Sequence, residues 1–474
     1  MNRLQRFAAP AGMALACLTV PAVSAERKPL PKELPAYGVM KPVKAPAVKQ
    51  LTLDNGMTVW LSPSAGFPKV AFTLAVRGGY TADPKDRPGL ADLLSATVTQ
   101  GTASRNARQL AEDVSAAGGD LNAESTSDAI AVETSVLSEK AVNALNLLAD
   151  VMRNATFSDA EVEIAKNNLS SALDANEADP SFLGRRALYR ALFGDHPYAV
   201  TAPARDTLTK TTAADLRKEY TRRFRPERTL LVVTGDFPED AMEAAVRAAF
   251  GSWKGVGEAA PINSEKPQVS ISKTIVYVPR ANSVQTAFLI GTLGPGRKEP
   301  DYAATRIADA IYGAMFGSRL VANIREDKGY TYSPGSRLAP KREAGVLATR
   351  ADVRNEVTGA SFNEISYELN RMATTKPDEQ ELEGARRYIL GSTALQLQSR
   401  QAVSRSLANL WIDSLPPEEL GRQTEKIAAV KPEDVEAAGR KYYPAWRMTV
   451  VTVGEEKVIR EELAPFGLEF RKAP

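Results

Sequence analysis

Two landmarks recur along this chain at nearly the same separation. The helix-like segment EVEIAKNNL begins at Glu161 and ELEGARRYIL begins at Glu381, an offset of 220 residues. The strand-like segments VVTGDF and VVTVGE align Gly235 with Gly454, an offset of 219 residues. Because landmarks of two different kinds keep one spacing, the chain is predicted to fold as two homologous halves.

Each half alternates strand-like and helix-like patterns. In the first half, QLTLDNGMTVWLS at 50–62 reads as two strands joined through Asn55-Gly56, a pair typical of a type I′ hairpin turn. Further strands are expected at 69–79 and 228–237 and a hairpin at 119–137, with helices at 88–100, 106–119, 138–153 and 158–177. The fold class is therefore α+β: two α/β two-layer sandwich half-domains, each an antiparallel-rich sheet covered by helices on one face.

The N-terminus has the pattern of a bacterial secretory signal. Residues 1–25 combine Arg3 and Arg6 with an apolar core too short to span a bilayer and end in Val-Ser-Ala before Glu26. Residues 26–48 are rich in Pro and Lys and are expected to form an extended arm. The predicted domains are 49–254 and 268–474, with a linker at 255–267, and the predicted location is the periplasm.

Composition excludes several classes of protein. The only cysteine, Cys17, lies in the signal, so the mature chain has no disulfide and no thiolate metal site. The net charge is +3 for the whole chain and near neutral without the signal arginines. This balance argues against nucleic acid as a partner, and no apolar run after the signal predicts a membrane segment.

Several segments together resemble one enzyme family. They include GLADLLSATVTQGT (89–102), GGDLNAESTSD (118–128), FGDHPY (193–198), VVTGDF (232–237) and SRLVANIREDKGYTYS (318–333). The chain resembles the pitrilysin/insulinase family of zinc peptidases over nearly all of 45–470. Active members of that family carry H-x-x-E-H in a helix, where two His bind zinc, the Glu acts as general base, and a later Glu is the third ligand.

The resemblance implies that this chain has lost the zinc site. Alignment on the flanking residues puts Asp92 and Ala96 at the two His positions, Ser95 at the base and Ala172 at the third ligand. The whole chain has one histidine, His196, so two His ligands are not available in any register. His196 itself is expected to be a turn residue before Pro197 with a local hydrogen bond. We expect no metal in this chain and zinc in a partner.

The second half keeps a pair that the family uses. The resemblance implies that Arg325 and Tyr332, seven residues apart in IREDKGYTY, reach the substrate carbonyl, where both can donate hydrogen bonds to developing negative charge. It also implies a substrate-binding edge strand at Asn122, Ala123 and Glu124. The alternatives stay open: Arg325 in an ordinary helix end with Tyr332 in an ordinary strand, and 120–124 as a plain hairpin strand.

The expected function follows from the missing zinc ligands and from the presence of Arg325 and Tyr332. The resemblance implies a non-catalytic subunit of a heterodimeric zinc peptidase, paired with a paralogous subunit that carries the zinc motif. The substrate would be an unfolded peptide, and Arg325 and Tyr332 would act in trans. The alternative is a stand-alone peptide-binding or assembly module without hydrolytic activity.

Overall fold

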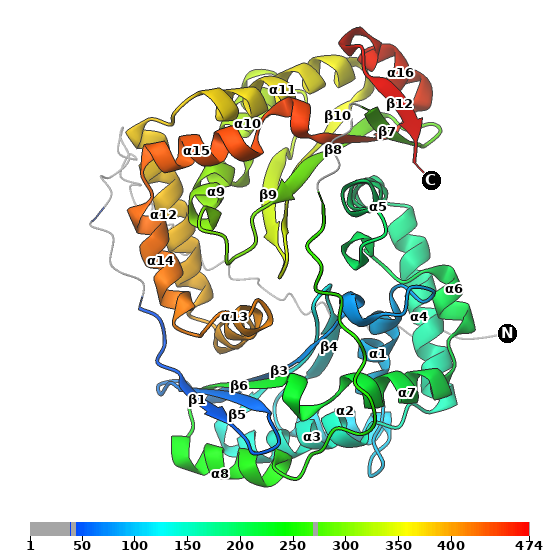
Figure 1. Ribbon diagram of the computed structural model, residues 1–474, viewed down its shortest axis with the longest axis vertical. Helices are drawn as coiled ribbons and strands as arrows, with labels where there is room; N and C mark the ends of the chain where they lie inside the picture. The colour runs from blue at the N-terminus through cyan, green and yellow to red at the C-terminus, as the bar shows by residue number, and fades with distance from the viewer. Residues whose placement is uncertain (1–37, 39–43, 269–273, 474) are drawn as a thin grey trace, which may run out of the picture. The chain divides into compact units, whose positions relative to one another are not determined.

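The computed structural model describes residue 38 and residues 44–268 and 274–473. The predicted signal at 1–25 and most of the predicted arm at 26–48 lie outside these residues. Both halves of the repeat belong to one compact unit, and Figure 1 labels its elements in chain order.

The first half is built on a six-stranded sheet with the order β1-β2-β6-β3-β5-β4. The pairs β1–β2, β3–β5, β3–β6 and β4–β5 are antiparallel, and β2 and β6 run parallel. Its elements are β1 Lys49–Thr52, β2 Thr58–Pro63, β3 Lys69–Arg77, α1 Leu90–Val98, α2 Ala107–Ala116, β4 Leu121–Ser125, β5 Ala129–Leu137, α3 Ala141–Asn154, α4 Asp159–Glu177, α5 Pro180–Phe193, α6 Arg205–Lys210, α7 Ala213–Arg223, β6 Thr229–Gly235 and α8 Glu239–Phe250.

The second half has a six-stranded sheet with the order β12-β7-β11-β8-β10-β9. Its elements are β7 Thr274–Pro279, β8 Gln285–Gly294, α9 Tyr302–Asp309, α10 Arg319–Val321, β9 Gly335–Pro340, β10 Gly345–Arg354, α11 Thr358–Thr374, α12 Glu379–Gln396, α13 Arg400–Ile412, α14 Glu419–Ala429, α15 Pro432–Tyr442, β11 Thr449–Gly454, α16 Glu456–Leu463 and β12 Glu469–Lys472.

The internal repeat is confirmed element by element. α4 and α12 begin at Asp159 and Glu379, and each is capped by the residue before it, Ser158 or Asp378. β6 and β11 end at Gly235 and Gly454. β4 and β9 occupy matching edges of their sheets. The predicted fold of two α/β half-domains with mostly antiparallel sheets is therefore confirmed.

One face of the first sheet carries the main core. Val70, Phe72, Leu74 and Val76 alternate along β3 and are all buried against the helices of the same half. This alternation is the period-2 pattern of a strand whose one face meets a helical layer. The helical layer includes α1 and α3, so the core fixes α1, the helix with the expected zinc-motif positions.

The opposite face of each sheet is covered by a helix from the other half, which the sequence did not reveal. Leu407 and Trp411 of α13 pack on Trp60 and Val232 of the first sheet. In the same way, Leu188 of α5 belongs to the core cluster of the second sheet. Figure 1 shows α13 against the sheet of β3 and β6. α5 and α13 are equivalent in the repeat, so the halves exchange equivalent helices.

The predicted type I′ turn is wrong, although the hairpin itself is present. β1 and β2 pair antiparallel, and Gly56 has a φ of 87°. Asn55 is absent from the residues with positive φ, which a type I′ turn would require at both central positions. Its side chain instead donates to the carbonyls of Phe250 (2.8 Å) and Trp253 (3.0 Å). A main-chain hydrogen bond from Gly56 to the carbonyl of Leu53 (2.8 Å) closes the turn.

Two further findings concern the connections. Residues 255–267 contain no helix or strand, and they lie between the end of α8 and the start of β7. Within the described part of the chain, no helix is both long enough and apolar enough to cross a bilayer.

Candidate functional site

The helix α1 is positioned by a buried ion pair. The carboxylate of Asp83 accepts hydrogen bonds from the main-chain nitrogens of Gly89 (2.8 Å) and Ala91 (3.1 Å) at the start of α1. Asp83 in turn pairs with the guanidinium of Arg223 at 2.9 Å, and Arg223 is fully buried. Gly89 has a φ of 83°, and a Cβ there would lie 2.2 Å from the Cα of Pro203. Helix α1 therefore has little freedom to shift.

Asp92, which aligns with the first zinc-binding His of the family, accepts hydrogen bonds from two side chains of the first half. Its Oδ1 accepts hydrogen bonds from the hydroxyl of Tyr80 at 3.0 Å and from the Oγ of Ser125. Burial raises the pKa of Asp92, and the two hydroxyl hydrogen bonds oppose that shift. Since Ser125 is the last residue of β4, Asp92 fastens the edge strand to α1.

The second half has an equivalent fastening. Asp309 is the last residue of α9, the counterpart of α1, and it is buried. It accepts hydrogen bonds from the Oγ of Ser336 and from the main-chain nitrogen of Leu338 (2.9 Å), both in β9. Each half thus uses an aspartate to hold its edge strand, and Asp92 performs the same structural task as Asp309.

The other three motif positions offer no metal chemistry. Ser95 is buried, and its hydroxyl donates to the main-chain oxygen of Asp92 at 3.0 Å. Ala96 is half-buried and Ala172 is exposed on α4. Across the described residues, no group of three His, Cys, Asp or Glu side chains could hold a metal ion. One carboxylate that already accepts two hydroxyl hydrogens does not fit a zinc ion, which needs three protein ligands or more.

Arg325 and Tyr332 lie together. Arg325 belongs to the π-helical segment Ala322–Asp327, and Gly329, two residues beyond its end, has a φ of 62°. The chain then turns back, so the guanidinium carbon of Arg325 is 4.9 Å from the ring centre of Tyr332. A second ring, Phe316, has its centre 4.8 Å from the same carbon. Tyr332 is 80% exposed and the Arg325 side chain is 28% exposed, so solvent reaches the pair mainly at the tyrosine.

The two predicted site regions have no direct contact in the described residues. Arg325 makes one ion pair, with Glu326 at 3.2 Å, and two ring contacts, with Phe316 and Tyr332. None of these reaches α1 or α4. The structure therefore does not join the Arg/Tyr pair to the lost zinc positions of the same chain.

Asn122, Ala123 and Glu124 lie on β4, the edge strand of the first sheet. The side chains of Asn122 and Glu124 are exposed, and Ala123 is half-buried. Only β5 pairs with β4 among the described strands. The outer side of β4 thus presents main-chain groups that another strand could bind.

His196 has the local role that its position predicts. Its Nδ1 accepts a hydrogen bond from the main-chain nitrogen of Tyr198 at 3.1 Å, which caps the short helix Pro197–Ala199. Its Nε2 lies 3.0 Å from the carbonyl oxygen of Glu265. Both ring nitrogens are therefore engaged in turn structure.

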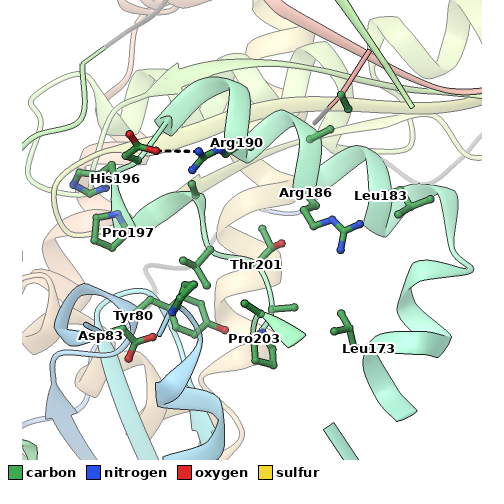
Figure 2. Close-up of a pocket in the computed structure, with 18 of the residues that line it drawn as sticks. Tyr80, Asp83, Leu173, Leu183, Arg186, Arg190, His196, Pro197, Thr201 and Pro203 are labelled. Atoms are coloured by element: carbon green, nitrogen blue, oxygen red, sulfur yellow. Dashed lines mark ion pairs between the residues drawn. The ribbon is translucent and has the colours of Figure 1, made fainter. Parts of the chain in front are cut away.

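A cavity of about 930 Å³ adjoins this region. Figure 2 shows Tyr80 and Asp83 on one side of it and Arg186 on another. The cationic groups that α5 contributes are already paired, Arg186 with Glu177 at 2.7 Å and Arg190 with Asp195 at 2.9 Å. We therefore place no reaction in this cavity.

Two family profiles match the chain, one over most of the first half and one from the end of the first half into the second. Residues 59–202 match the family profile described as insulinase (peptidase family M16), and residues 210–389 match the profile described as peptidase M16 inactive domain.

The chain belongs to peptidase family M16. An uncharacterized zinc protease of Bacillus subtilis is 27% identical over 364 residues, covering 74% of this chain and 85% of that protein. An uncharacterized zinc protease of Mycobacterium leprae is 27% identical over 384 residues, covering 80% and 84%.

Solved structures share the fold. A peptidase M16 inactive domain from Pseudomonas fluorescens has a TM-score of 0.80 at 24% identity, covering 86% of this chain and 98% of that one. A protease from Helicobacter pylori has a TM-score of 0.80 at 17% identity, covering 87% and 100%.

The residues that sequence reasoning missed are the partners of the motif positions. The sequence gives no signal that links Tyr80 and Ser125 to α1, because separation along the chain does not give distance in space. Asp83 is the exception. An acidic residue six positions before Gly89 is the one local hint, since carboxylates favour helix N-termini.

Proposed function

We propose that this chain is the non-catalytic subunit of a periplasmic heterodimeric zinc peptidase. Arg325 and Tyr332 would complete an active site whose zinc lies in a paralogous partner subunit, and the substrate would be an unfolded peptide. The observation that carries the proposal is a contrast between the halves. Asp92 and Ser95 are engaged in structural hydrogen bonds, whereas Tyr332 is exposed and Arg325 is half-buried, with one ion pair to its sequence neighbour Glu326.

The chemistry of the pair supports this role. During peptide hydrolysis negative charge develops on the carbonyl oxygen, and hydrogen-bond donors fixed at that oxygen stabilise the transition state. A guanidinium offers five N–H donors and a phenol offers one. Contact between the Arg325 guanidinium and the Tyr332 ring holds both groups at one place. The pair would therefore donate to the substrate carbonyl when the partner presents it.

The edge strand supports peptide binding by the same chain. A peptide in extended conformation can add to the outer side of β4 through main-chain hydrogen bonds, at Asn122, Ala123 and Glu124. This mode needs no particular side chain, as binding of varied unfolded peptides requires. It also serves the alternative function, a stand-alone peptide-binding or assembly module that never hydrolyses its ligand.

The test is reconstitution with a paralogous subunit that carries H-x-x-E-H. The mixture should cleave an unfolded reporter peptide. Arg325→Ala and Tyr332→Phe should each lower kcat by about 10²–10³-fold, the usual effect of losing one such donor. Arg440→Ala and Tyr367→Phe are matched controls, because both side chains are exposed elsewhere in the second half. They should leave kcat unchanged.

Two results would decide against the proposal. Unchanged kcat in Arg325→Ala and Tyr332→Phe would remove the assigned role of the pair. A chain that binds peptide but gives no cleavage with any zinc-motif paralogue would favour the binding-module function.

A further inference from the structure

The second half exposes large apolar side chains around Arg325. Phe316 is 70% exposed and Tyr332 is 80% exposed, and both rings contact the Arg325 guanidinium. Large aromatic residues that stay in water forgo the free energy of burial, about 25 cal/mol per Å² of apolar surface. Clustered exposure of this kind indicates a surface that binds something.

Helix α12 extends this surface. Gly384, Tyr388, Gly391 and Leu395 follow one another at helical spacing on a single face, and all four are exposed. A Cβ added at either glycine would meet nothing within 4 Å, so the face is open. The hydroxyl of Tyr388 donates to the carbonyl of Ala314 at 3.2 Å, which places this helix face beside the segment that leads to Phe316.

We name Phe316, Tyr332, Tyr388 and Leu395 the apolar strip. Leu395 is 68% exposed and Tyr388 is 45% exposed. Leu395 lies seven positions after Tyr388 on the helix, a rise of about 10 Å. An extended chain covers that distance in about three residues. The strip therefore has the length of a short extended peptide segment.

Beside the strip, the Arg325 guanidinium and the Tyr332 hydroxyl have few acceptors within the described part of the chain. Arg325 pairs only with Glu326, its sequence neighbour, through one of its five N–H donors. The Tyr332 hydroxyl forms no hydrogen bond with a described residue. Next to them, Asp327 and Lys328 carry opposite charges. The surface thus combines apolar contact area with free donors and little net charge.

We propose that the apolar strip binds apolar side chains of an unfolded, uncharged peptide segment whose main-chain carbonyl accepts hydrogen bonds from Arg325 and Tyr332. Carbonyl oxygens and apolar side chains in alternation are what an extended peptide presents. Because side chains two or four positions apart share one face of an extended chain, the strip selects substrates with apolar residues at such spacings. This inference rests on the proposed function for its ligand class, and it adds Phe316, Tyr388 and Leu395 as specificity determinants.

The experiment measures binding by the isolated full-length mature chain, without a partner. The probe is a fluorescein-labelled Gly/Ser dodecapeptide that carries Leu and Phe four residues apart, on one face of the extended chain, and its comparison peptide has Ser at both positions. Fluorescence anisotropy should show at least tenfold tighter binding of the Leu/Phe peptide, as expected for partial burial of two apolar side chains.

The variants Phe316→Ser and Leu395→Ser should each weaken binding of the Leu/Phe peptide by about tenfold and leave the Ser peptide unaffected. Matched controls are Phe67→Ser and Val142→Ser, which replace exposed apolar side chains of the first half. They should bind as the unmodified chain does. Circular dichroism melts confirm that every variant is folded.

The outcomes separate this inference from the proposed function. Equal affinity for both peptides, or unchanged binding in Phe316→Ser and Leu395→Ser, overturns the apolar strip as a peptide site. Loss of association with a zinc-motif subunit in these variants, with peptide binding intact, assigns the strip to the subunit interface and also overturns it. Absence of cleavage in the reconstituted mixture, with selective peptide binding retained, contradicts the proposed function alone.

Discussion

Replacing Arg223 with Met tests how the helix of the lost zinc motif is held. The Arg223 guanidinium is fully buried and contacts Asp83 at 2.9 Å and Glu219 at 3.2 Å. It also donates to the carbonyls of Gly79 (3.3 Å) and Ala82 (3.0 Å). Met keeps much of the side-chain volume and removes every one of these hydrogen bonds.

The expected loss of stability is large. Removing one partner of a buried ion pair costs about 3–5 kcal/mol, because the remaining charge stays buried without compensation. Here Asp83, whose side chain is 4% exposed, loses its ion-pair partner, whereas Glu219 keeps its pair with Arg222 at 2.6 Å. Against a total unfolding free energy of about 5–15 kcal/mol, this is a major fraction.

The loss should depend on pH in a defined direction. Burial raises the pKa of Asp83 from 3.8 to about 6, and the Arg223 charge opposes that shift. A carboxyl whose pKa is higher in the folded state lowers stability as pH rises through that folded pKa. Without Arg223 the pKa of Asp83 rises further. The difference between Arg223→Met and the unmodified chain should therefore be larger at pH 8 than at pH 5.

Urea unfolding followed by circular dichroism measures this difference at both pH values. Arg247→Met is the matched control, since its pair with Glu243 is half exposed and should be worth less than about 0.5 kcal/mol. Adding Asp83→Asn to Arg223→Met should recover part of the loss by removing the unpaired charge. A loss below about 1 kcal/mol, or one that does not change with pH, would refute this reasoning.

Four further predictions concern the exchanged helix α13, the open face of α12, the close contact of Gly439 in α15 and the metal. Leu407→Ala on α13 should lower the free energy of unfolding by about 2–5 kcal/mol in urea titration, because Leu407 is fully buried on the first sheet; a loss under about 1 kcal/mol would contradict packing there. Gly384→Ala should raise it by about 0.5–1 kcal/mol, since its Cβ meets nothing. Gly439→Ala should lower it, since its Cβ would lie 2.1 Å from the Met372 oxygen. Metal analysis of the purified chain should find no stoichiometric zinc and no chelator-sensitive cleavage; finding either would contradict the poor fit of Asp92 and its neighbours to zinc.

Several features were predictable from local patterns. The glycine at 118 has a φ of 76° just after α2, as the Gly118-Gly119 pair at a helix end predicts. The predicted hairpin at 119–137 is present as β4 and β5. Such features depend on residues near one another in sequence, so propensity and periodicity suffice. The predicted turn type at Asn55 was wrong, and no local pattern shows that this side chain bonds to carbonyls almost two hundred positions away.

In the candidate site too, some features were predictable from the sequence and others were not. The positions expected for the zinc ligands came from the sequence, because alignment with the family needs only residues within two helices, α1 and α4. Their partners were not, since Tyr80 and Ser125 reach Asp92 only once β4 and α1 are packed. The exposure of Phe316 beside Arg325 was equally unreadable, because an aromatic residue in a connecting segment shows no periodicity.

By itself, the sequence determined that this chain has two homologous halves and that it lacks the imidazoles for an M16 zinc site. Both conclusions need only spacing and counting. Only the tertiary structure decided which sheet each of the equivalent helices α5 and α13 covers, what Asp92 now does, and which aromatic rings surround Arg325. The physical reason is that an apolar helix face specifies that it must be buried but not against what, so its partner emerges from the packing of the whole chain.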